Sequence, residues 1–214
     1  MIDDKKDKEN WDSYFIEGTN VLKNNLGIKN IEELKEEEKM IVRKTLASLY
    51  LKPVEGNFDL KHLEEIHKRI FVLIYPFAGK LRTCSLQKDN HIFCYPNEIE
   101  KRTKETLEEM NETFNNEIHS LNEFAHYLGE YYFELISIHP FREGNGRAIR
   151  TFIRDFVREK SKYYDFGPLD LDYTKLDKNN LMLGTACKYL YPSMLEMEFI
   201  KGLVKLEKTH KNTK

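Results

Sequence analysis

The chain has 214 residues and a net charge of −2 at pH 7. A length in this range fits one domain with a sizeable core. The nearly balanced charge excludes the broad basic surface that holds nucleic acid without sequence preference. We therefore expect a single domain over residues 1–214 and no nucleic-acid partner.

Cysteine usage and hydropathy indicate the compartment. Cys84, Cys94 and Cys187 are an odd and sparse set, which favours free thiols over a disulfide framework. The N-terminus is too polar for a signal peptide, and no apolar run approaches the ~20 residues that span a bilayer. We expect a cytoplasmic protein with no membrane partner, and these features leave secretion as an effector open.

The N-terminal part of the chain has helical patterning between charged ends. Residues 1–10 and the tail from about residue 205 are charged and weakly patterned, so we expect both to fray. Good helix formers and apolar residues at helical spacing predict helices over residues 31–51 and 60–75. Asp59 is the expected cap of the second helix.

Residues 81–95 lose the helical period. β-Formers on either side of the polar residues Lys88, Asp89 and Asn90 predict a short hairpin, the only convincing strand signal in the chain. Residues 97–117 then predict a polar, exposed helix.

Two better marked helices follow in the middle of the chain. Ser120 and Glu123 form a capping box, and the helix after it delivers the chain to His139. Beyond a pair of glycines, a further helix carries an apolar stripe that we expect to be buried: Ile149, Phe152, Ile153, Phe156 and Val157.

The C-terminal region predicts a connection and two helices. Residues 164–175 contain glycine, proline and several aspartates, as a connection would. Asp177 caps a helix to about residue 190, and Pro192 begins another to about residue 206. These C-terminal helices at 177–206 complete an all-α fold with one hairpin.

The run HPFREGNGRAIR at residues 139–150 supplies parts for transferring a phosphate-containing group. His139 is the nearby side chain that ordinarily titrates near neutral pH, which makes it the candidate general base. Glu143 is a hard oxygen donor suited to holding Mg²⁺ together with nucleotide phosphates. Arg147 and Arg150 lie three apart on a helix, so both can grip outer phosphates. Backbone N–H groups at the helix start attract phosphate, and the residues there are Gly144, Gly146 and Asn145, whose side chain adds a donor.

Each of these residues alone has an ordinary interpretation. Loop histidines and helix arginines are commonly solvated, and Glu-Gly-Asn-Gly alone predicts a turn. A chance match of nine specified positions, each at about one in twenty, is far rarer than one in a million. We therefore treat residues 139–150 as one functional site.

This run resembles the signature of the Fic (filamentation induced by cyclic AMP) proteins, H-P-F-x-[D/E]-G-N-G-R-x-x-R, and matches it in full. The segment GNFDLKHLEEIHKRIFVLIYPFAGKLRT at 56–83 is similar to the family's helix that ends in an aromatic-Ala-Gly-x-x-Arg segment. The best-matching part of the chain is residues 56–157. The resemblance implies a Fic-type helical bundle with one small β-hairpin flap over the active site.

The resemblance also implies protein adenylylation, in which AMP from ATP is joined to a Ser, Thr or Tyr hydroxyl of a target protein and diphosphate leaves. By position in the signature, His139 would take the hydroxyl proton and Glu143 would hold Mg²⁺ on the α- and β-phosphates. The other matched positions would form an anion hole (Gly144, Asn145 and Gly146), bind the β- and γ-phosphates (Arg147 and Arg150) and shape the loop (Pro140, and Phe141 packed inward).

The hairpin acquires a function from the same resemblance. In Fic proteins the flap lies over the nucleotide and pairs its edge with an extended segment of the target. The residues that would sit at its tip near ATP are Lys88, Asp89, Asn90 and His91. An ordinary surface hairpin is the alternative. Because such pairing recognises backbone more than side chains, the sequence does not name the target, and auto-adenylylation stays open.

A possible inhibitory segment lies within residues 11–30. Many Fic proteins are inhibited by a helix of pattern [S/T]-x-x-x-E-[G/N], whose Glu pairs with the second signature arginine and displaces the γ-phosphate. The stretch from Ser13 to Gly18 matches this pattern, which implies that Glu17 pairs with Arg150. The same region also resembles the Gly-Thr-x-x-Leu segment of Fic proteins without an inhibitory helix. In that case a separate antitoxin protein, or no inhibitor, takes its place.

Two further assignments carry alternatives. Asn179 and Asn180 fall where family members contribute nucleotide contacts, and an ordinary helix start is the alternative. For the function, the alternatives are removal of AMP by the same fold and a nucleotide- or protein-binding module without turnover.

Overall fold

A computed structural model of the chain describes residues 4–88, 91–116 and 118–206. The chain groups into two compact units, Met1–Glu108 with Glu134–Phe152 and Glu109–Phe133 with Ile153–Lys214. None of the helices in the described ranges has the length and apolar character needed to cross a membrane.

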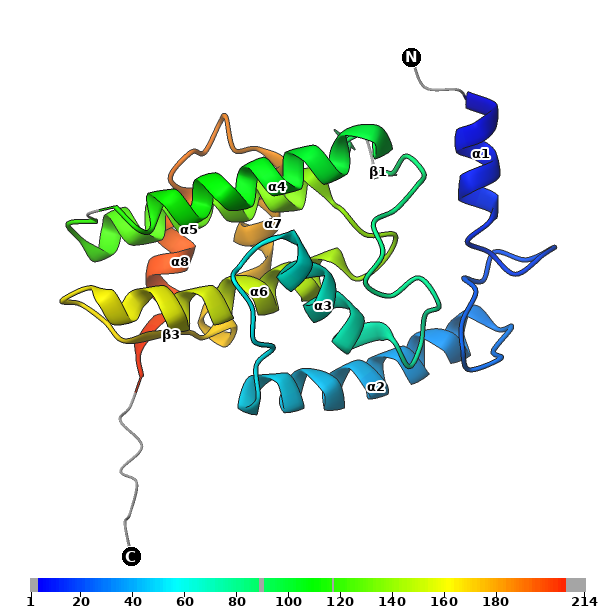
Figure 1. Cartoon of the computed structure of the whole chain (residues 1–214), viewed down its shortest axis with the longest axis horizontal. Coiled ribbons are helices and arrows are strands. Elements are labelled where there is room, and N and C mark those ends of the chain that lie inside the picture. The colour runs from blue at the N-terminus through cyan, green and yellow to red at the C-terminus, as the bar shows by residue number, and fades with distance from the viewer. Residues whose placement is uncertain (1–3, 89–90, 117, 207–214) are drawn as a thin grey trace, which may run out of the picture. The chain divides into compact units, whose positions relative to one another are not determined.

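The first unit begins with three helices, α1 (Asp4–Asp12), α2 (Ile31–Leu51) and α3 (Leu60–Phe71), of which α2 and α3 pack together (Figure 1). Helix α2 has the predicted bounds, because the Asn30 side chain accepts hydrogen bonds from the first amides of the helix. Asp59 caps α3 as predicted. Helix α1 shows that the prediction of a frayed segment at residues 1–10 was wrong over the described residues.

Helix α3 ends at Phe71, four residues earlier than predicted. Beyond Phe71 the chain forms a turn, in which Ile74 N–H and Tyr75 N–H both donate to Phe71 O at 2.8 Å. The next carbonyl oxygens are bound by another segment. Asn25 Nδ2 donates to Val72 O at 2.9 Å, and Asn25 N–H donates to Ile74 O at 2.7 Å. Pro76 also disfavours a helical conformation in the residue before it.

The predicted hairpin is confirmed in a shorter form. Strands β1 (Gln87–Lys88) and β2 (His91–Ile92) pair antiparallel, and Phe93 N–H donates to Leu86 O at 3.1 Å beyond them. The base of this flap is joined to the signature loop by a bridge between Leu81 and Phe141.

Three helices contribute to both units: α4 (Pro96–Thr113), α5 (Leu121–Ile138) and α6 (Asn145–Lys160). The expected exposure of α4 is wrong on one face, where Ile99, Leu107 and Met110 are buried. The Ser120 cap of α5 is confirmed, since Ser120 Oγ accepts from Glu123 N–H at 3.1 Å. The Glu123 carboxylate accepts from His119 N–H at 2.7 Å, one residue before the position that a capping box uses. The stripe of α6 is fully buried as predicted, at Ile149, Phe152, Ile153, Phe156 and Val157.

The second unit contains a two-stranded sheet that the sequence analysis missed. Strands β3 (Leu169–Leu171) and β4 (Leu203–Lys205) pair antiparallel, with Asp170 opposite Val204. Arg158 binds the Asp170 carboxylate through two nitrogens at 2.7 Å. Part of the expected connection at 164–175 is therefore a strand, because it pairs with residues that are distant in the sequence.

The remaining elements of the second unit are short. They are the 3₁₀ turns at Ser161–Tyr163 and Tyr173–Lys175 and the helices α7 (Lys178–Ala186) and α8 (Met194–Gly202). Asp177 caps α7 as predicted, but the helix ends four residues before the expected position. Phe114 packs edge-on against Phe124 and Phe156, with ring centroids about 5 Å apart, and builds the core of this unit.

Candidate active site

The signature loop begins where α5 ends. His139 has a φ of 53°, a left-handed conformation that residues other than glycine rarely adopt. Its Nδ1 lies 3.1 Å from Ile136 O, and because a carbonyl oxygen only accepts, the ring proton is on Nδ1. The lone pair of the neutral ring is then on Nε2, the atom that can accept a proton. Phe93 from the flap stacks on this ring with centroids 4.0 Å apart and fixes its orientation.

Asn145, the first residue of α6, closes the loop on itself. Phe141 N–H donates to Asn145 Oδ1, and Asn145 Nδ2 donates to Phe141 O, each at 2.7 Å. The Asn145 residue is 2% exposed. This corrects the expectation that its side chain donates to a phosphate oxygen, because the amide is buried and engaged inside the loop. Pro140, at the start of the loop, accepts a hydrogen bond from Arg82 N–H at 2.9 Å.

His67 of α3 supports the loop through hydrogen bonds and ring stacking, and the sequence analysis missed it. Its Nδ1 accepts from Gly79 N–H at 2.8 Å, so the ring proton is on Nε2, which donates to Glu143 O at 2.8 Å. The ring stacks on Phe141, which is buried as predicted, with centroids 3.8 Å apart. Burial lowers the pKa of His67 to about 4, so the ring is neutral at pH 7.

The start of α6 has the geometry of an anion site. Gly144 has a φ of 81°, and a Cβ there would lie 2.3 Å from the Phe71 ring, so only glycine fits. Its N–H donates to Glu143 Oε1 at 2.9 Å. Within the described part of the chain, no acceptor lies in hydrogen-bond reach of the amides of Asn145 and Gly146. Such N-terminal amides attract phosphate oxygens.

Arg147 is held between two carboxylates. It forms ion pairs with Glu38 of α2 and, at 3.1 Å, with Glu143. Tyr75 Oη also donates to Glu38, and burial together with this hydrogen bond raises the pKa of Tyr75. The sequence analysis missed Glu38, which lies 109 positions before Arg147. The pairing orients Glu143 as well as Arg147.

Arg150 folds back over the start of the same helix. A Cβ added at Gly146 would lie 3.1 Å from Arg150 Nη1. The guanidinium is therefore beside the helix-start amides, where a second charge can reach an anion bound there. The structure brings His139, Glu143, Gly146 and Arg150 together in one loop and one helix turn.

Arg82 is the second buried support that the sequence analysis did not single out. Its guanidinium donates to the carbonyl oxygens of His139, Cys84, Cys94 and Ile138 at 2.6 to 3.1 Å. Burial lowers its pKa to about 10, which leaves it charged at pH 7. Arg82 thus joins the flap base to the residue that precedes the loop, and it is the arginine of the aromatic-Ala-Gly-x-x-Arg segment.

The expected flap-tip contacts are only partly within the described residues. Lys88 is exposed in β1. Asp89 and Asn90 lie outside the described residues, and so does the side chain of His91. Their contacts to ATP stay predictions.

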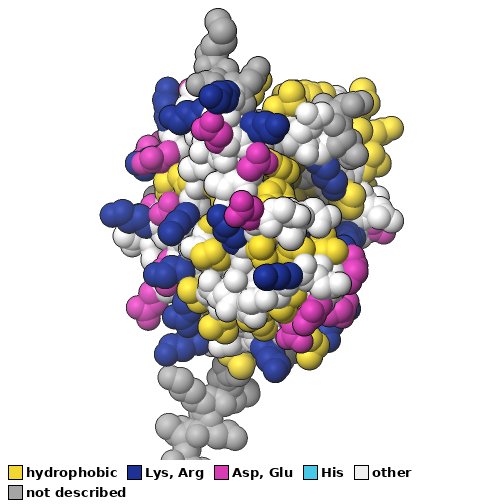
Figure 2. Space-filling view, turned by 90° about the vertical axis from the view of Figure 1, so that its right-hand side faces the viewer, with side chains coloured by type: hydrophobic (Ala, Val, Ile, Leu, Met, Phe, Trp, Pro, Cys, Tyr) yellow, Lys and Arg dark blue, Asp and Glu magenta, His cyan; other side chains and the backbone are white. Residues whose placement is uncertain are grey.

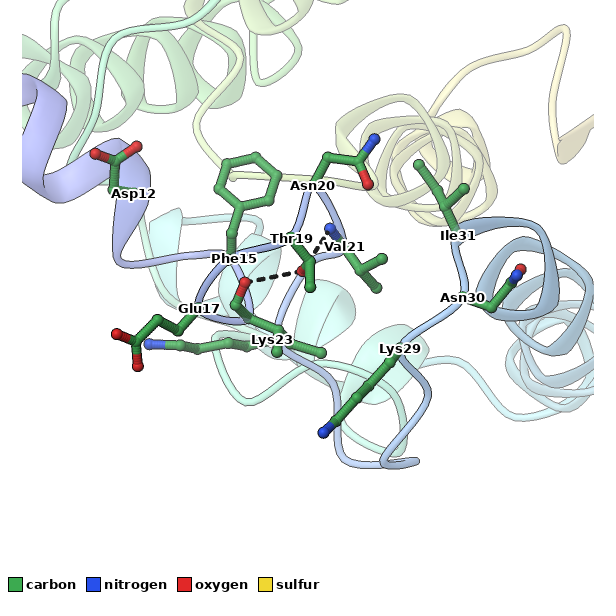
Figure 3. Close-up of a pocket in the computed structure, with 12 residues that line it drawn as sticks. Asp12, Phe15, Glu17, Thr19, Asn20, Val21, Lys23, Lys29, Asn30 and Ile31 are labelled. Atoms are coloured by element: carbon green, nitrogen blue, oxygen red, sulfur yellow. Dashed lines mark hydrogen bonds between the residues drawn. The ribbon is translucent and has the colours of Figure 1, made fainter.

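The region of the expected inhibitory helix is a turn. Helix α1 ends at Asp12, and Ser13 Oγ closes that end by donating to Asn10 O at 2.6 Å. Gly18 has a φ of 72°, and Thr19 Oγ1 donates to Ile16 O at 2.8 Å (Figure 3). The turn is therefore built by the Gly-Thr pair, which belongs to the Gly-Thr-x-x-Leu pattern of the alternative resemblance.

Glu17 lies on this turn and lines an open pocket that also includes Lys23 and Ile31 at the start of α2 (Figure 3). Within the described ranges, neither Glu17 nor Arg150 forms an ion pair. The expected pairing of Glu17 with Arg150 is therefore absent from this structure.

Asn179 and Asn180 belong to the second unit. Asp177 Oδ1 accepts from both of their amides, at 2.7 and 3.0 Å, and Asn180 Nδ2 donates to Glu198 at 2.9 Å. These contacts match the alternative of an ordinary helix start.

A magnesium ion bound at this site would need nucleotide phosphates as further ligands. Among the described residues, no group of three or more His, Cys, Asp or Glu side chains could hold a metal ion. The carboxylate of Glu143 beside the helix-start amides fits Mg²⁺, which binds proteins through one or two carboxylates plus substrate phosphates.

Residues 57–157 match the model of the Fic/DOC family. The chain is 31% identical over 149 residues to the probable protein adenylyltransferase Fic of Salmonella typhimurium, covering 70% of this chain and 74% of that protein. It is 35% identical over 155 residues to the protein adenylyltransferase VbhT of Bartonella schoenbuchensis. That match covers 72% of this chain but only 32% of VbhT.

Solved structures share the fold. BepC, a VirB-translocated effector protein of Bartonella tribocorum with bound AMPPNP, superposes with a TM-score of 0.79 at 24% identity. The match covers 92% of this chain and 98% of BepC. The chain belongs to the Fic/DOC family.

Proposed function

We propose that the chain is a protein adenylyltransferase, which transfers AMP from ATP to a Ser, Thr or Tyr hydroxyl of a target protein. The observation that carries the proposal is the loop geometry. His139, protonated on Nδ1, comes shortly before a helix whose first amides have no hydrogen-bond acceptor within the described residues, and Arg150 lies beside these amides. Relatives that share the signature region are named protein adenylyltransferases. Structural neighbours described with bound AMPPNP or ADP support ATP as the substrate.

The chemistry divides among the loop residues. His139 Nε2 accepts the proton of the target hydroxyl as its oxygen attacks the α-phosphorus, and diphosphate leaves. The amides of Asn145 and Gly146 bind phosphate oxygens, and Arg150 holds the outer phosphates. Arg147, paired with Glu38 and Glu143, adds positive charge at the same helix turn.

Glu143 is the residue that would hold Mg²⁺ on the nucleotide phosphates. When bound, the ion neutralises charge that develops on the leaving diphosphate. The hydrogen bond from His67 to the Glu143 carbonyl and the ion pair with Arg147 fix the position of this carboxylate.

Labelled ATP tests the proposal. Wild type and His139→Ala are incubated with cell lysate and either α- or γ-labelled ATP. We expect protein labelling from the α-position only, and only by wild type. Labelling from the γ-position would make the protein a kinase. Nucleotide binding that survives His139→Ala, with no labelled product from wild type, would indicate the binding module.

The target is proposed to bind along the flap, and an inhibitor, where one acts, to be a separate antitoxin protein. The turn at residues 13–19 and the lack of an ion pair at Arg150 within the described ranges argue against inhibition through Glu17. Removal of AMP was the alternative linked to Glu17. The missing ion pair between Glu17 and Arg150 argues against this alternative too.

A further inference from the structure

A contact outside the signature roles connects the N-terminus to the catalytic loop. Arg142 occupies the variable position of the signature, between Phe141 and Glu143. Its guanidinium lies 4.3 Å from the ring centroid of Trp11 and 5.2 Å from that of Phe15. The Tyr14 ring is 5.6 Å away. Three aromatic rings from one short segment therefore surround one loop cation.

The aromatic faces are the main partners of this cation. Arg142 Nε is buried without a hydrogen-bond acceptor, and no carboxylate in the described ranges forms an ion pair with Arg142. A guanidinium over aromatic faces is attracted by the negative charge of the ring face. This attraction becomes stronger as water is excluded, so it is strongest for the buried part of the Arg142 guanidinium.

The same segment also holds the base of the flap. Asp7 Oδ1 accepts from Ser85 N–H at 2.8 Å, and Asn10 Nδ2 donates to Thr83 O at 2.9 Å. Tyr14 Oη accepts from Thr83 N–H at 3.1 Å. Residues 7–15, which we name the N-terminal clamp, thus contact both the loop and the chain that leads into the flap.

We propose that the N-terminal clamp positions the catalytic loop against the flap for transfer, and that Arg142 is the positioning residue through which it acts. This inference rests on the proposed function. The flap carries Phe93 on His139, and the loop carries Glu143, so one segment contacts the chain on both sides of the reacting centre. Loosening it misaligns the base and the phosphate ligands without removing either, which lowers kcat more than nucleotide affinity.

A substitution series distinguishes the effect of the contact between Arg142 and the aromatic ring from the effect of side-chain volume. We expect Trp11→Leu and Arg142→Met each to lower the rate of AMP transfer about tenfold, while the nucleotide Kd changes less than about threefold. Trp11→Phe keeps a ring and retains most of the activity. The double variant Trp11→Leu/Arg142→Met is no slower than Arg142→Met alone, because Trp11 has no cation to contact once Arg142 is replaced. Arg43→Met, on the exposed face of α2, is the matched control and leaves the rate unchanged.

Trp11 also reports the contact directly, because it is the only tryptophan of the chain. We expect Arg142→Met to change its emission and Arg43→Met to leave it unchanged. Unchanged emission with Arg142→Met, additive rate losses, or wild-type rates in both single variants would overturn the inference. A wild type without any transfer activity would overturn the proposed function instead, and the emission comparison would then still decide whether the contact exists.

Discussion

At the scale of single residues, the site depends on buried side chains that do not touch the proposed substrates. His67 holds the Glu143 carbonyl, and Arg82 holds the His139 carbonyl. Both act on main-chain atoms, so they set the position of a functional residue without competing for its side chain. This arrangement predicts that stability and activity depend on the same two residues.

The titration of His67 is expected to be visible in the stability of the protein. Its pKa is lowered from 6.5 to about 4 by burial, so the unfolded chain binds this proton more readily than the folded one. The stability it contributes is complete above pH 7 and is lost as the pH falls from about 6.5 towards 4. Between pH 7.5 and 5.5 we expect a loss of about 1 kcal/mol from this residue.

Urea unfolding of wild type and His67→Gln at the two pH values isolates that loss. Glutamine can accept from Gly79 and donate to Glu143 but does not titrate, while all other groups are common to both proteins. An equal pH dependence in the two proteins would show that His67 is not buried in its neutral form.

Removing Arg82 is expected to destabilise the protein strongly. Arg82→Met leaves four carbonyl oxygens without their donor, so we expect a loss of about 3 kcal/mol or more in the free energy of unfolding. Chemical denaturation measures it, and Arg43→Met, on an exposed face, should change it by less than about 0.5 kcal/mol. A loss below about 1 kcal/mol would mean that water replaces the guanidinium.

The sequence predicts the part of the site that is contiguous. His139, Glu143 and Arg150 lie within twelve positions, and their spacing alone indicates a base beside an anion site. Asn145 was misassigned because the sequence does not reveal that its amide bonds back to Phe141. Glu38 could not be found at all, since nothing in the sequence pairs a polar helix residue with an arginine 109 positions later.

At the scale of elements, residues 13–19 form a turn where the resemblance implied an inhibitory helix. The turn built by Gly18 and Thr19 leaves Glu17 on an open pocket. The face in Figure 2 carries both charge signs among apolar side chains.

Glu17→Gly is therefore expected to leave activity unchanged. We expect the rate of auto-adenylylation with labelled ATP to stay within about twofold of wild type, because no ion pair is removed. Glu17→Gln is the matched control for the loss of charge alone. A rise of tenfold or more in the glycine variant would restore self-inhibition through Glu17.

Elements with local signals were predicted well, and elements with distant partners were not. Asn30, Asp59, Ser120 and Asp177 mark helix starts through hydrogen bonds within three residues, and three of these caps were predicted. Strand β3 was missed because its partner β4 follows more than thirty positions later. Helix α1 was missed for the same reason, as its polar side chains bind the chain at residues 83–85.

At the scale of the whole molecule, the two compact units are joined through continuous helices. Each of α4, α5 and α6 has residues in both units. Separate unfolding would have to break all three helices, and each new helix end leaves backbone N–H or C=O groups without their intrahelical partners. We therefore expect one cooperative transition, and the expectation of a single domain stays a prediction until it is measured.

Thermal unfolding followed by two probes tests this together with nucleotide binding. Trp11 fluorescence reports the first unit, which contains the signature loop, and far-UV circular dichroism reports helices of both units. ATP with Mg²⁺ at 100 times its Kd should stabilise the folded state by about 2.7 kcal/mol and raise both midpoints together by roughly 5 to 10 °C. Arg150→Gln should lose most of this shift, and Arg43→Gln should keep it. If only the fluorescence midpoint rises, the two units unfold separately and the helices that they share do not couple them.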